Sequence, residues 1–483
     1  MEKYKILVTI SIFFLLIGCS KDFLDKAPMG DVSDAAFWKT ETDLTGAVNG
    51  VYYVLRDRDA RNSGQFWPAA ANFPMNDIQT TQDASLINQA NMIFSPTDLW
   101  LQSIWNSGFV GVTRANIVIT RGSKMDNIDA SFRDTKIGEA KFFRGFYYLM
   151  LVRAYGDVPL FTEEQTDPSN RPVRTPKADV LAQMVKDFTD AADVLPVSWD
   201  DANVGRVTKG TAMAYLALTN LYQENWTSAI TNSETVIGLN KYELLPNHKD
   251  LYAWNVENTV ESLLEVQYRD EASDGTFLQY FFEPTIATAD MGCSPNGWGA
   301  WFPSNEFRKA FEPGDKRRWE ILSKGQTLDL IGGITFTMDS TSATPNGLAC
   351  AKYWVGRLPS GNSSDKNIVM LKYSEVILNY AEALANASRL PDAYVQINKI
   401  RTRAGLPGKS ASDLAICITD INKERRIENF MDENGWFDLT RTKQAAKFLL
   451  DNYGKTMPDK NYLFPIPQYE MDNNPNLTPN PGY

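Results

Sequence analysis

The fold is decided by the stretch VMLKYSEVILNYAEALANASRLPDAYVQINKIRTRAGLP (369–407). Its apolar residues recur every three or four positions, first along 373–384 and then along 393–400. Leu390-Pro391-Asp392 separates the two runs, and proline favours a break or a first helical turn. The spacing predicts two amphipathic helices within 370–405 that bury their stripes against each other.

The same pattern occurs earlier in the chain. Residues 139–155 carry a broad aromatic stripe that ends at Gly156-Asp157-Val158-Pro159, and 177–194 form another amphipathic segment. The segment 208–222 is apolar almost all round, and 226–237 repeat one apolar face with small residues. These paired segments resemble tetratricopeptide units. The predicted fold is mostly α with minor β, in which helix pairs form a superhelical scaffold.

Two long stretches do not follow this pattern. Residues 240–369 are rich in Gly, Pro, Asn, Ser and Trp, with short β-like runs at 262–268 and 334–338. Residues 57–105 are also irregular. Because long irregular stretches in a compact domain usually carry function, we expect both to be excursions from one domain spanning 19–483.

Composition excludes several classes of function. Lys plus Arg number 48 against 59 for Asp plus Glu, a formal charge of −11, which argues against nucleic acid as the main partner. His248 is the single histidine, which argues against serine-hydrolase triads and His-rich zinc sites, because histidine is the commonest residue in both. Cys293, Cys350 and Cys417 show no CxxC spacing, which favours buried free thiols and predicts no metal site.

The N-terminal residues have the pattern of an export signal. Lys3 and Lys5 precede an apolar run at 6–17, which is too short to span a membrane. The run ends in Leu16-Ile17-Gly18-Cys19, which resembles a bacterial lipobox. We therefore expect 1–18 to be a lipoprotein signal peptide and Cys19 the lipid anchor; an ordinary secretory signal is the alternative.

Five blocks in order resemble the SusD/RagB family. They are GEAKFFRGFYYLMLVRAYGDVPLF (138–161), NWTSAITNSETVIGLNKYELL (225–245), the opening helix pair, INKERRIEN (421–429) and NYLFPIPQYEMDNNPNLTPNPGY (461–483). These blocks are scaffold. Glu424, Arg425 and Arg426, which look like a catalytic cluster, are expected to be a semi-buried ion-pair network, because charges inside a fold need partners.

The resemblance implies a non-catalytic lipoprotein of the outer membrane that faces the cell surface and needs no cofactor. It also implies a SusC-like TonB-dependent transporter as partner and a glycan as ligand. Peptide capture in a RagAB-type importer is an alternative within the family. An endo-acting glycosidase and a pure helical scaffold are alternatives from other classes. Whether a calcium ion is bound stays open.

Candidate ligand residues come from the two excursions. Glycans offer flat C–H faces and hydroxyls, which suit exposed aromatic rings beside amides and carboxylates. The stretches 63–83 with 95–102, and 288–307, have this mixture. The predicted ligand-binding residues are Trp67, Phe73, Asp77, Trp100, Asn296, Trp298 and Trp301, and no catalytic residue is predicted.

Cys19→Ala tests the anchor. Because Cys19 is the only candidate acyl acceptor at the end of the signal, the variant should leave the outer-membrane fraction. Fractionation in cells that lack the partner transporter measures this. Retention of the variant with the membrane in those cells contradicts the lipobox interpretation.

Overall fold

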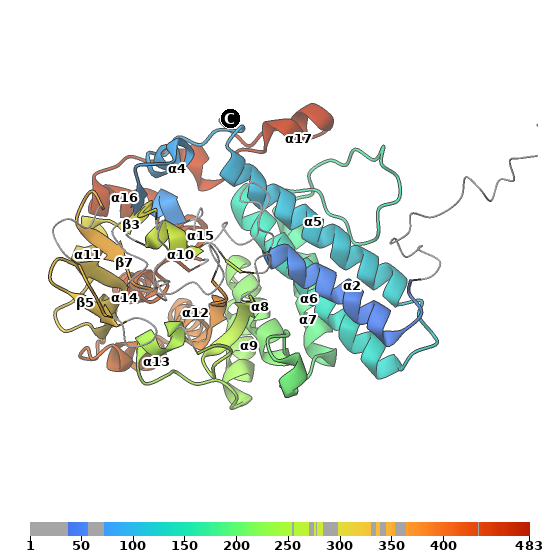
Figure 1. Cartoon of the computed structure of the whole chain (residues 1–483), viewed down its shortest axis with the longest axis horizontal. Helices are drawn as coiled ribbons and strands as arrows, with labels where there is room; N and C mark the ends of the chain where they lie inside the picture. Colours follow the sequence, from blue (N-terminus) through green and yellow to red (C-terminus); the bar gives the residue numbers. More distant parts are fainter. Residues whose placement is uncertain are drawn as a thin grey trace, which may run out of the picture.

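The computed structural model describes residues 37–56, 72–253, 256–269, 275–276, 278–283, 298–329, 335–338, 344–352, 364–432 and 434–483. Helices dominate these residues and form most of the body in Figure 1. The longer ones are α2 (Glu41–Tyr53), α5 (Leu99–Gly122), α6 (Ala130–Tyr155), α7 (Lys177–Val194), α8 (Lys209–Tyr222), α9 (Trp226–Gly238), α12 (Tyr373–Asn386), α13 (Leu390–Arg403) and α14 (Leu414–Glu428). The shorter ones are α4 (Ala84–Ala90), α10 (Leu278–Phe282), α11 (Asn305–Ala310), α15 (Gly435–Arg441), α16 (Ala445–Tyr453) and α17 (Gln468–Asn473).

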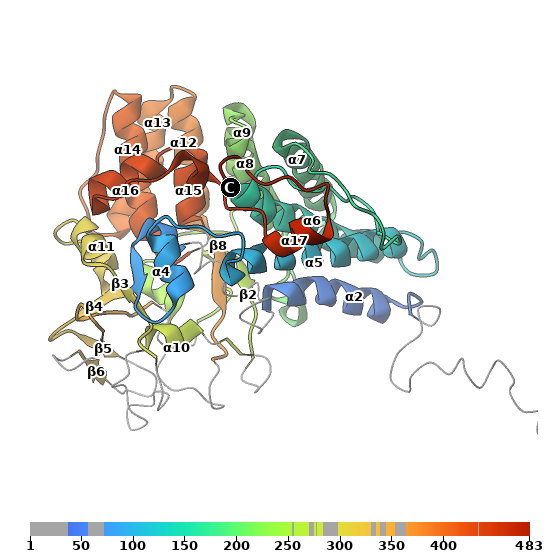
Figure 2. The ribbon, with the colours of Figure 1, turned by 90° about the horizontal axis from the view of Figure 1, so that it is seen from above.

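Successive helices pack against one another. α5 contacts α6, α6 contacts α7, α7 contacts α8 and α8 contacts α9. The stack then continues from α9 to α12 and on to α13 and α14, although residues 240–369 intervene in sequence. Figure 2 shows these helices side by side. The predicted tetratricopeptide-like scaffold, mostly α with minor β, is confirmed.

Local signals explain where the helices begin and end. Thr208 caps α8 with a capping box to Thr211, and the side chain of Asn225 caps α9. α6 ends at Gly156, whose φ of 74° suits a residue without a Cβ. α7 has the predicted bounds, and the others differ by a few residues at most, except that α6 begins nine residues before the predicted 139.

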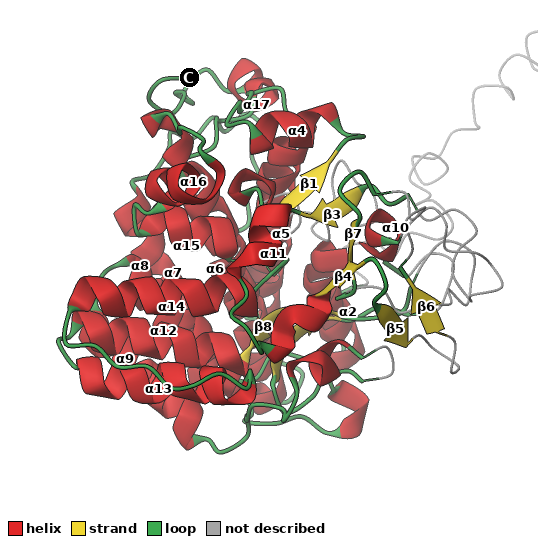
Figure 3. Ribbon diagram, turned by 90° about the vertical axis from the view of Figure 1, so that its left-hand side faces the viewer, coloured by secondary structure: helices red, strands yellow, loops and turns green. Residues whose placement is uncertain are grey.

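The start of the opening stretch is a strand rather than helix. β8 (Ile368–Lys372) pairs antiparallel with β2 (Ser262–Val266), so the predicted helix pair begins at Tyr373. β-branched Ile368 and Val369 favour the strand. The other two-stranded pairs are β1 (Ile78–Thr80) with β3 (Trp301–Pro303), β4 (Ile321–Ser323) with β7 (Leu348–Cys350), and β5 (Thr327–Asp329) with β6 (Thr335–Thr337). In Figure 3 the strands gather on one side of the helices.

The aromatic stripe of α6 forms the centre of the helical core. Phe142, Phe143, Phe146 and Tyr147 have no exposed surface. α5 approaches them closely through Gly111, because a Cβ there would lie 2.3 Å from Cδ2 of Tyr147. Substitution of Gly111 by any larger residue would therefore push the two helices apart.

The charged run on α14 is an ion-pair network, as expected. Glu424 accepts hydrogen bonds from Arg401 and, at 2.8 Å, from Arg317. Arg425 pairs with Glu382 of α12 at 2.8 Å, and Arg426 pairs with Asp77 at 2.6 Å. Each charge has a buried partner on a different element, which fastens α14 to its surroundings.

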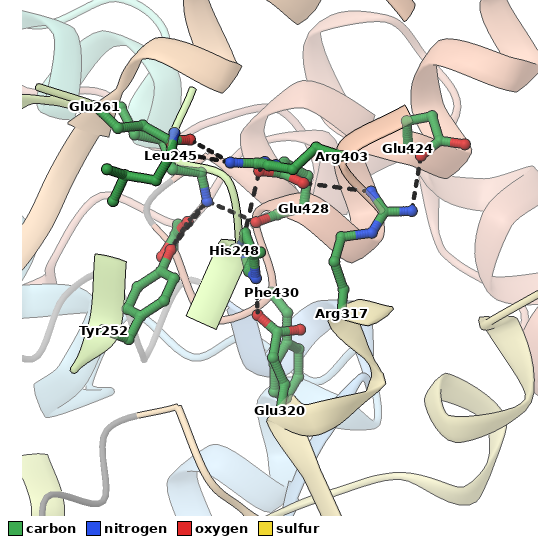
Figure 4. A network of polar contacts seen from close by, with 12 residues as sticks. Leu245, His248, Tyr252, Glu261, Arg317, Glu320, Arg403, Glu424, Glu428 and Phe430 are labelled. Carbon is green, nitrogen blue, oxygen red and sulfur yellow. Dashed lines mark hydrogen bonds and ion pairs between the residues drawn. The ribbon is translucent and has the colours of Figure 1, made fainter. Parts of the chain in front are cut away.

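The network extends to the short 3-10 helices η5 (His248–Tyr252) and η7 (Lys316–Glu320) of the second excursion. Figure 4 shows Glu428, at the end of α14, beside Arg403 and Arg317. Arg403 also donates to Glu261 at 2.6 Å, and the Lys372 ammonium donates to the Glu428 carbonyl at 2.6 Å. The second excursion is thus held onto α13 and α14 by buried charge pairs.

The C-terminal residues follow the surface as a strap. Asn480 donates to the carbonyls of Tyr155, at 3.0 Å, and Phe464, at 2.7 Å, and the Arg174 guanidinium donates to the Thr478 carbonyl at 2.9 Å. Cys350 and Cys417 are buried, whereas Cys19 and Cys293 lie outside the described residues. In the described part of the chain, no helix has the length and apolar character needed to cross a bilayer.

Glu320 makes the stability depend on pH. Its buried carboxyl has no hydrogen-bond partner among the described residues, and the nitrogens of His248 and Lys352 lie 3.8 Å and 3.9 Å from it. Burial raises the pKa of Glu320 to about 8, so the native carboxyl holds a proton at pH 7 that the unfolded chain has lost. Burial also lowers the pKa of His248, so that the native imidazole stays neutral.

Between pH 6.5 and 8, the native His248 is neutral and at most half of the unfolded imidazole is protonated, so Glu320 decides the sign of the slope. The free energy of unfolding should fall there as pH rises, by up to about 1.4 kcal/mol per unit. Below pH 6.5 the unfolded His248 gains a proton that the native state does not, which gives a slope of the opposite sign. Urea unfolding of wild type and Glu320→Gln at pH 6.5, 7.25 and 8 measures the difference, and equal slopes would contradict the assignment.

Candidate functional site

The two excursions named from the sequence meet at the β1–β3 pair. Ile78 lies opposite Pro303, Gln79 opposite Phe302 and Thr80 opposite Trp301. Residues more than two hundred positions apart therefore share one small antiparallel sheet (Figure 3). This pairing brings candidate residues from both stretches into one place.

Aromatic rings cluster around Trp301 on this sheet. The Phe281 ring of α10 stacks on Trp301 with centroids 4.1 Å apart, and Trp100 approaches it edge-on at 6.2 Å. Trp298 packs edge-on against Phe281 at 5.2 Å and is 49% exposed. We call Trp100, Phe281, Trp298 and Trp301 the aromatic platform. Its inner ring is Trp301 and its outermost ring is Trp298.

Uncharged polar groups lie beside the platform. The Gln82 amide donates to the Trp298 carbonyl at 2.9 Å, and the Trp100 indole N–H donates to the Asp83 carboxylate at 3.0 Å. Thr80 is half-buried and Thr81 is exposed on the same short segment. The edge of the platform can therefore offer hydroxyl and amide groups to a ligand.

Trp100 is placed by helix capping. Asp98 accepts the backbone N–H groups of Trp100 and Leu101 and begins α5, so the first excursion ends before its predicted limit at 105. The first turn of a long helix thus fixes Trp100, with its indole on Asp83.

Asp77 clamps the platform to the scaffold. Its carboxylate accepts two hydrogen bonds from Arg426, at 2.6 and 3.0 Å, and one from the Tyr453 hydroxyl, while its carbonyl accepts Ser304 N–H at 2.8 Å. Burial, together with the Asp77 carboxylate, raises the pKa of Tyr453, so the phenol stays protonated and donates. The clamp fixes β1 and the residues after β3 to α14 and α16.

A close approach at Gly435 supports the same segment. A Cβ there would lie 2.5 Å from the Met75 sulfur, in the 3-10 helix η3 (Phe73–Met75) that precedes β1. The glycine at the start of α15 therefore lets η3 pack directly against that helix.

The structure divides the predicted ligand residues into three groups. Trp298 is exposed and Trp100 is half-buried at the platform edge. Phe73, Asp77 and Trp301, which were also predicted to bind ligand, are buried: the rings of Phe73 and Trp301 pack against each other, and the Asp77 carboxylate is bound by Arg426. Trp67 and Asn296 lie outside the described residues.

The sequence prediction missed Phe281 and Gln82. The aromatic run at 280–282 was a usable signal for Phe281, since it lies in an irregular stretch. Gln82 belongs to the platform only through the β1–β3 pairing, which the sequence does not reveal. Within the described ranges, no group of three or more His, Cys, Asp or Glu residues is placed to hold a metal ion.

The fold and the site define a tetratricopeptide-like scaffold whose irregular excursions meet in an aromatic platform. The model of the SusD family matches residues 335–483, and a family model described as "Starch-binding associating with outer membrane" matches 22–221. The "SusD-like protein P2" of Formosa agariphila is 27% identical over the full length of both chains. The chain belongs to the SusD/RagB family.

Solved structures agree with this membership. A SusD-like protein from Bacteroides fragilis has a TM-score of 0.82 at 24% identity and covers 95% of this chain and 100% of its own. A "Laminarin binding SusD-like protein" has a TM-score of 0.78 at 25% identity and covers 92% of this chain and 100% of its own. The fold is thus shared along nearly the whole chain.

Trp301 and Trp298 should respond differently to truncation. Trp301→Ala removes a core ring that Phe73, Trp100, Phe281 and Phe282 surround, and should lower the free energy of unfolding by about 3–5 kcal/mol. Trp298→Ala, at a half-exposed ring, should cost less than about 1 kcal/mol. Denaturant unfolding of both variants measures this, and equal losses would contradict the assignment of inner and outer rings.

Proposed function

We propose that this chain is a non-catalytic lipoprotein, anchored in the outer membrane through Cys19 and facing the cell surface, that binds neutral glycans. It passes them to a SusC-like TonB-dependent transporter that it covers as a lid. The observation that carries the ligand class is the exposed ring of Trp298, fixed on a buried aromatic stack and bordered by uncharged polar groups. The family models and the laminarin-binding relative support the same class.

Stacking chemistry explains why the site suits a sugar. A pyranose ring presents a flat C–H face that packs on an indole, and its hydroxyls can bond to the Gln82 and Thr81 side chains at the edge. The buried stack under Trp298 and the Asp77 clamp hold this surface in place before the ligand arrives. Preorganisation lowers the entropy cost of binding.

Catalysis is the less favoured alternative. Glycoside hydrolysis uses two carboxyl groups about 5–9 Å apart across the scissile bond. Two acidic residues near the platform have structural roles: Asp83 accepts from the Trp100 indole, and Asp77 is bound by Arg426. A peptide ligand, as for a RagAB-type importer, would be recognised mainly through its backbone.

Calorimetry tests the glycan proposal. The chain beginning at Ser20 is titrated with laminarihexaose, maltohexaose and a tryptic digest of casein. Trp298→Ala should weaken saccharide binding roughly 5- to 150-fold without lowering the melting temperature, on the scale of one buried aromatic side chain. Leu450→Ala on α16, at a side chain that is 56% exposed, is the matched control for the loss of an exposed apolar side chain.

Three outcomes separate the candidate functions. Saccharide binding that Trp298→Ala weakens, with the same oligosaccharide length before and after prolonged incubation, supports the proposal. New reducing ends that a heat-treated control does not produce would put the endo-acting glycosidase first. Binding of casein peptides with no saccharide binding would put the peptide importer first.

A further inference from the structure

A groove lies beside α5, on a face of that helix different from the one that carries Trp100. It has a volume of about 1000 Å³ and runs between α5, the irregular segment 159–172 and α17. Its residue Asn106 follows Trp100 by six positions, which is roughly 240° around a helix, so the groove and the platform face different ways. Figure 1 and Figure 2 both show α17 beside α5.

Hydrogen bonds hold the walls of this groove together. Gln468 N–H of α17 donates to the Pro96 carbonyl at 2.9 Å, just before α5. The Arg171 guanidinium donates to the Asn473 carbonyl at 2.9 Å, and the Asn474 amide donates to the Pro172 carbonyl at 2.8 Å. The groove is therefore formed by the folded chain itself and does not need a ligand to assemble it.

Its lining combines rings with uncharged polar groups. Nine of the nineteen lining residues are aromatic or carry a side-chain amide. Trp105, Phe109 and Phe161 are buried or half-buried, and Tyr469 is 64% exposed. This mixture gives apolar faces next to hydrogen-bonding groups.

Three uncharged groups of the lining are available to a ligand. Among the described residues, the half-buried Asn106 amide and the hydroxyls of Thr113 and Tyr469 have no hydrogen-bond partner. The two arginines of the lining donate to backbone carbonyls, Arg171 to that of Asn473 and Arg114 to that of Gly50 at 2.8 Å. A ligand with many hydroxyls matches the amide and the two hydroxyls.

We propose that this groove is a second glycan-binding site that takes a neutral oligosaccharide. The choice of ligand class rests on the proposed function of the platform. A peptide fits less well, because two walls are helices whose backbone groups bond within the helix and cannot add a strand. The rings of Tyr469 and Phe109 stack on the sugar, and Asn106 and Thr113 bond to its hydroxyls.

Binding stoichiometry tests the second site. Laminarihexaose and maltohexaose are titrated into the chain beginning at Ser20, and wild type should take up two molecules of the bound saccharide. Tyr469→Ala and Asn106→Ala should each weaken one binding event roughly five- to hundredfold and leave the other unchanged. Trp298→Ala should weaken the other binding event and leave the event in the groove unchanged. Leu450→Ala is the control, and melting curves check that each variant is folded.

The outcomes distinguish this inference from the proposed function. A single binding event that Trp298→Ala abolishes and Tyr469→Ala and Asn106→Ala leave intact overturns the second site but keeps the platform. A single event that only the groove variants weaken supports the second site and overturns the platform. No binding of either saccharide to wild type overturns the second site as stated.

Discussion

The position of Glu428 at the end of α14 constrains the rest of the molecule. A fully buried carboxylate needs cationic or hydrogen-bonding partners, and Glu428 finds them in Arg403 of α13 and Arg317 of η7, with its own carbonyl on Lys372 of β8. The pKa of Glu428 is held well below its usual value, against the effect of burial, by Arg403 and the neighbouring cations. Because detaching any of these segments would leave a buried charge unpaired, the second excursion has one place on the scaffold.

The same helix also determines where the first excursion lies. Successive residues of a helix point about 100° apart, so Glu424, Arg425, Arg426 and Glu428 face different neighbours. Arg426 forms an ion pair with Asp77, which precedes β1, whereas Glu424 and Glu428 form ion pairs with arginines of η7 and α13. Two excursions fixed to one helix can pair as β1 and β3 with a defined register. The aromatic platform depends on this shared attachment.

Hydrophobic periodicity was enough to predict the scaffold, because each amphipathic stripe depends only on residues that are close to one another in the sequence. The helices from α6 to α9 and the α12–α13 pair follow from it, and the ion-pair role of 424–426 follows from the cost of unpaired buried charge. The platform could be predicted only as a set of candidates. Trp298 and Trp301 are three residues apart in similar surroundings, yet one is 49% exposed and the other 1%. Distant partners decide this difference: Phe73, Phe281 and the β1 register bury Trp301. The partner of Asp77 could not be predicted for the same reason, since Arg426 lies 349 positions away.

Binding an uncharged ligand limits the affinity of each single site. A stacked ring and a few uncharged hydrogen bonds contribute only modestly, because both the sugar and the protein give up water to form them. A surface receptor that uses such contacts gains most by holding one long chain at more than one point, since the second contact is then made at a high effective concentration. Trp100 and the groove at Asn106 point about 120° apart around α5 and are separated along its axis by roughly 9 Å, at 1.5 Å per residue. A glycan would have to bend around α5 to reach both sites. A long, flexible polymer can therefore bind both at once and gains affinity. Stiff or short glycans bind the two sites as separate molecules.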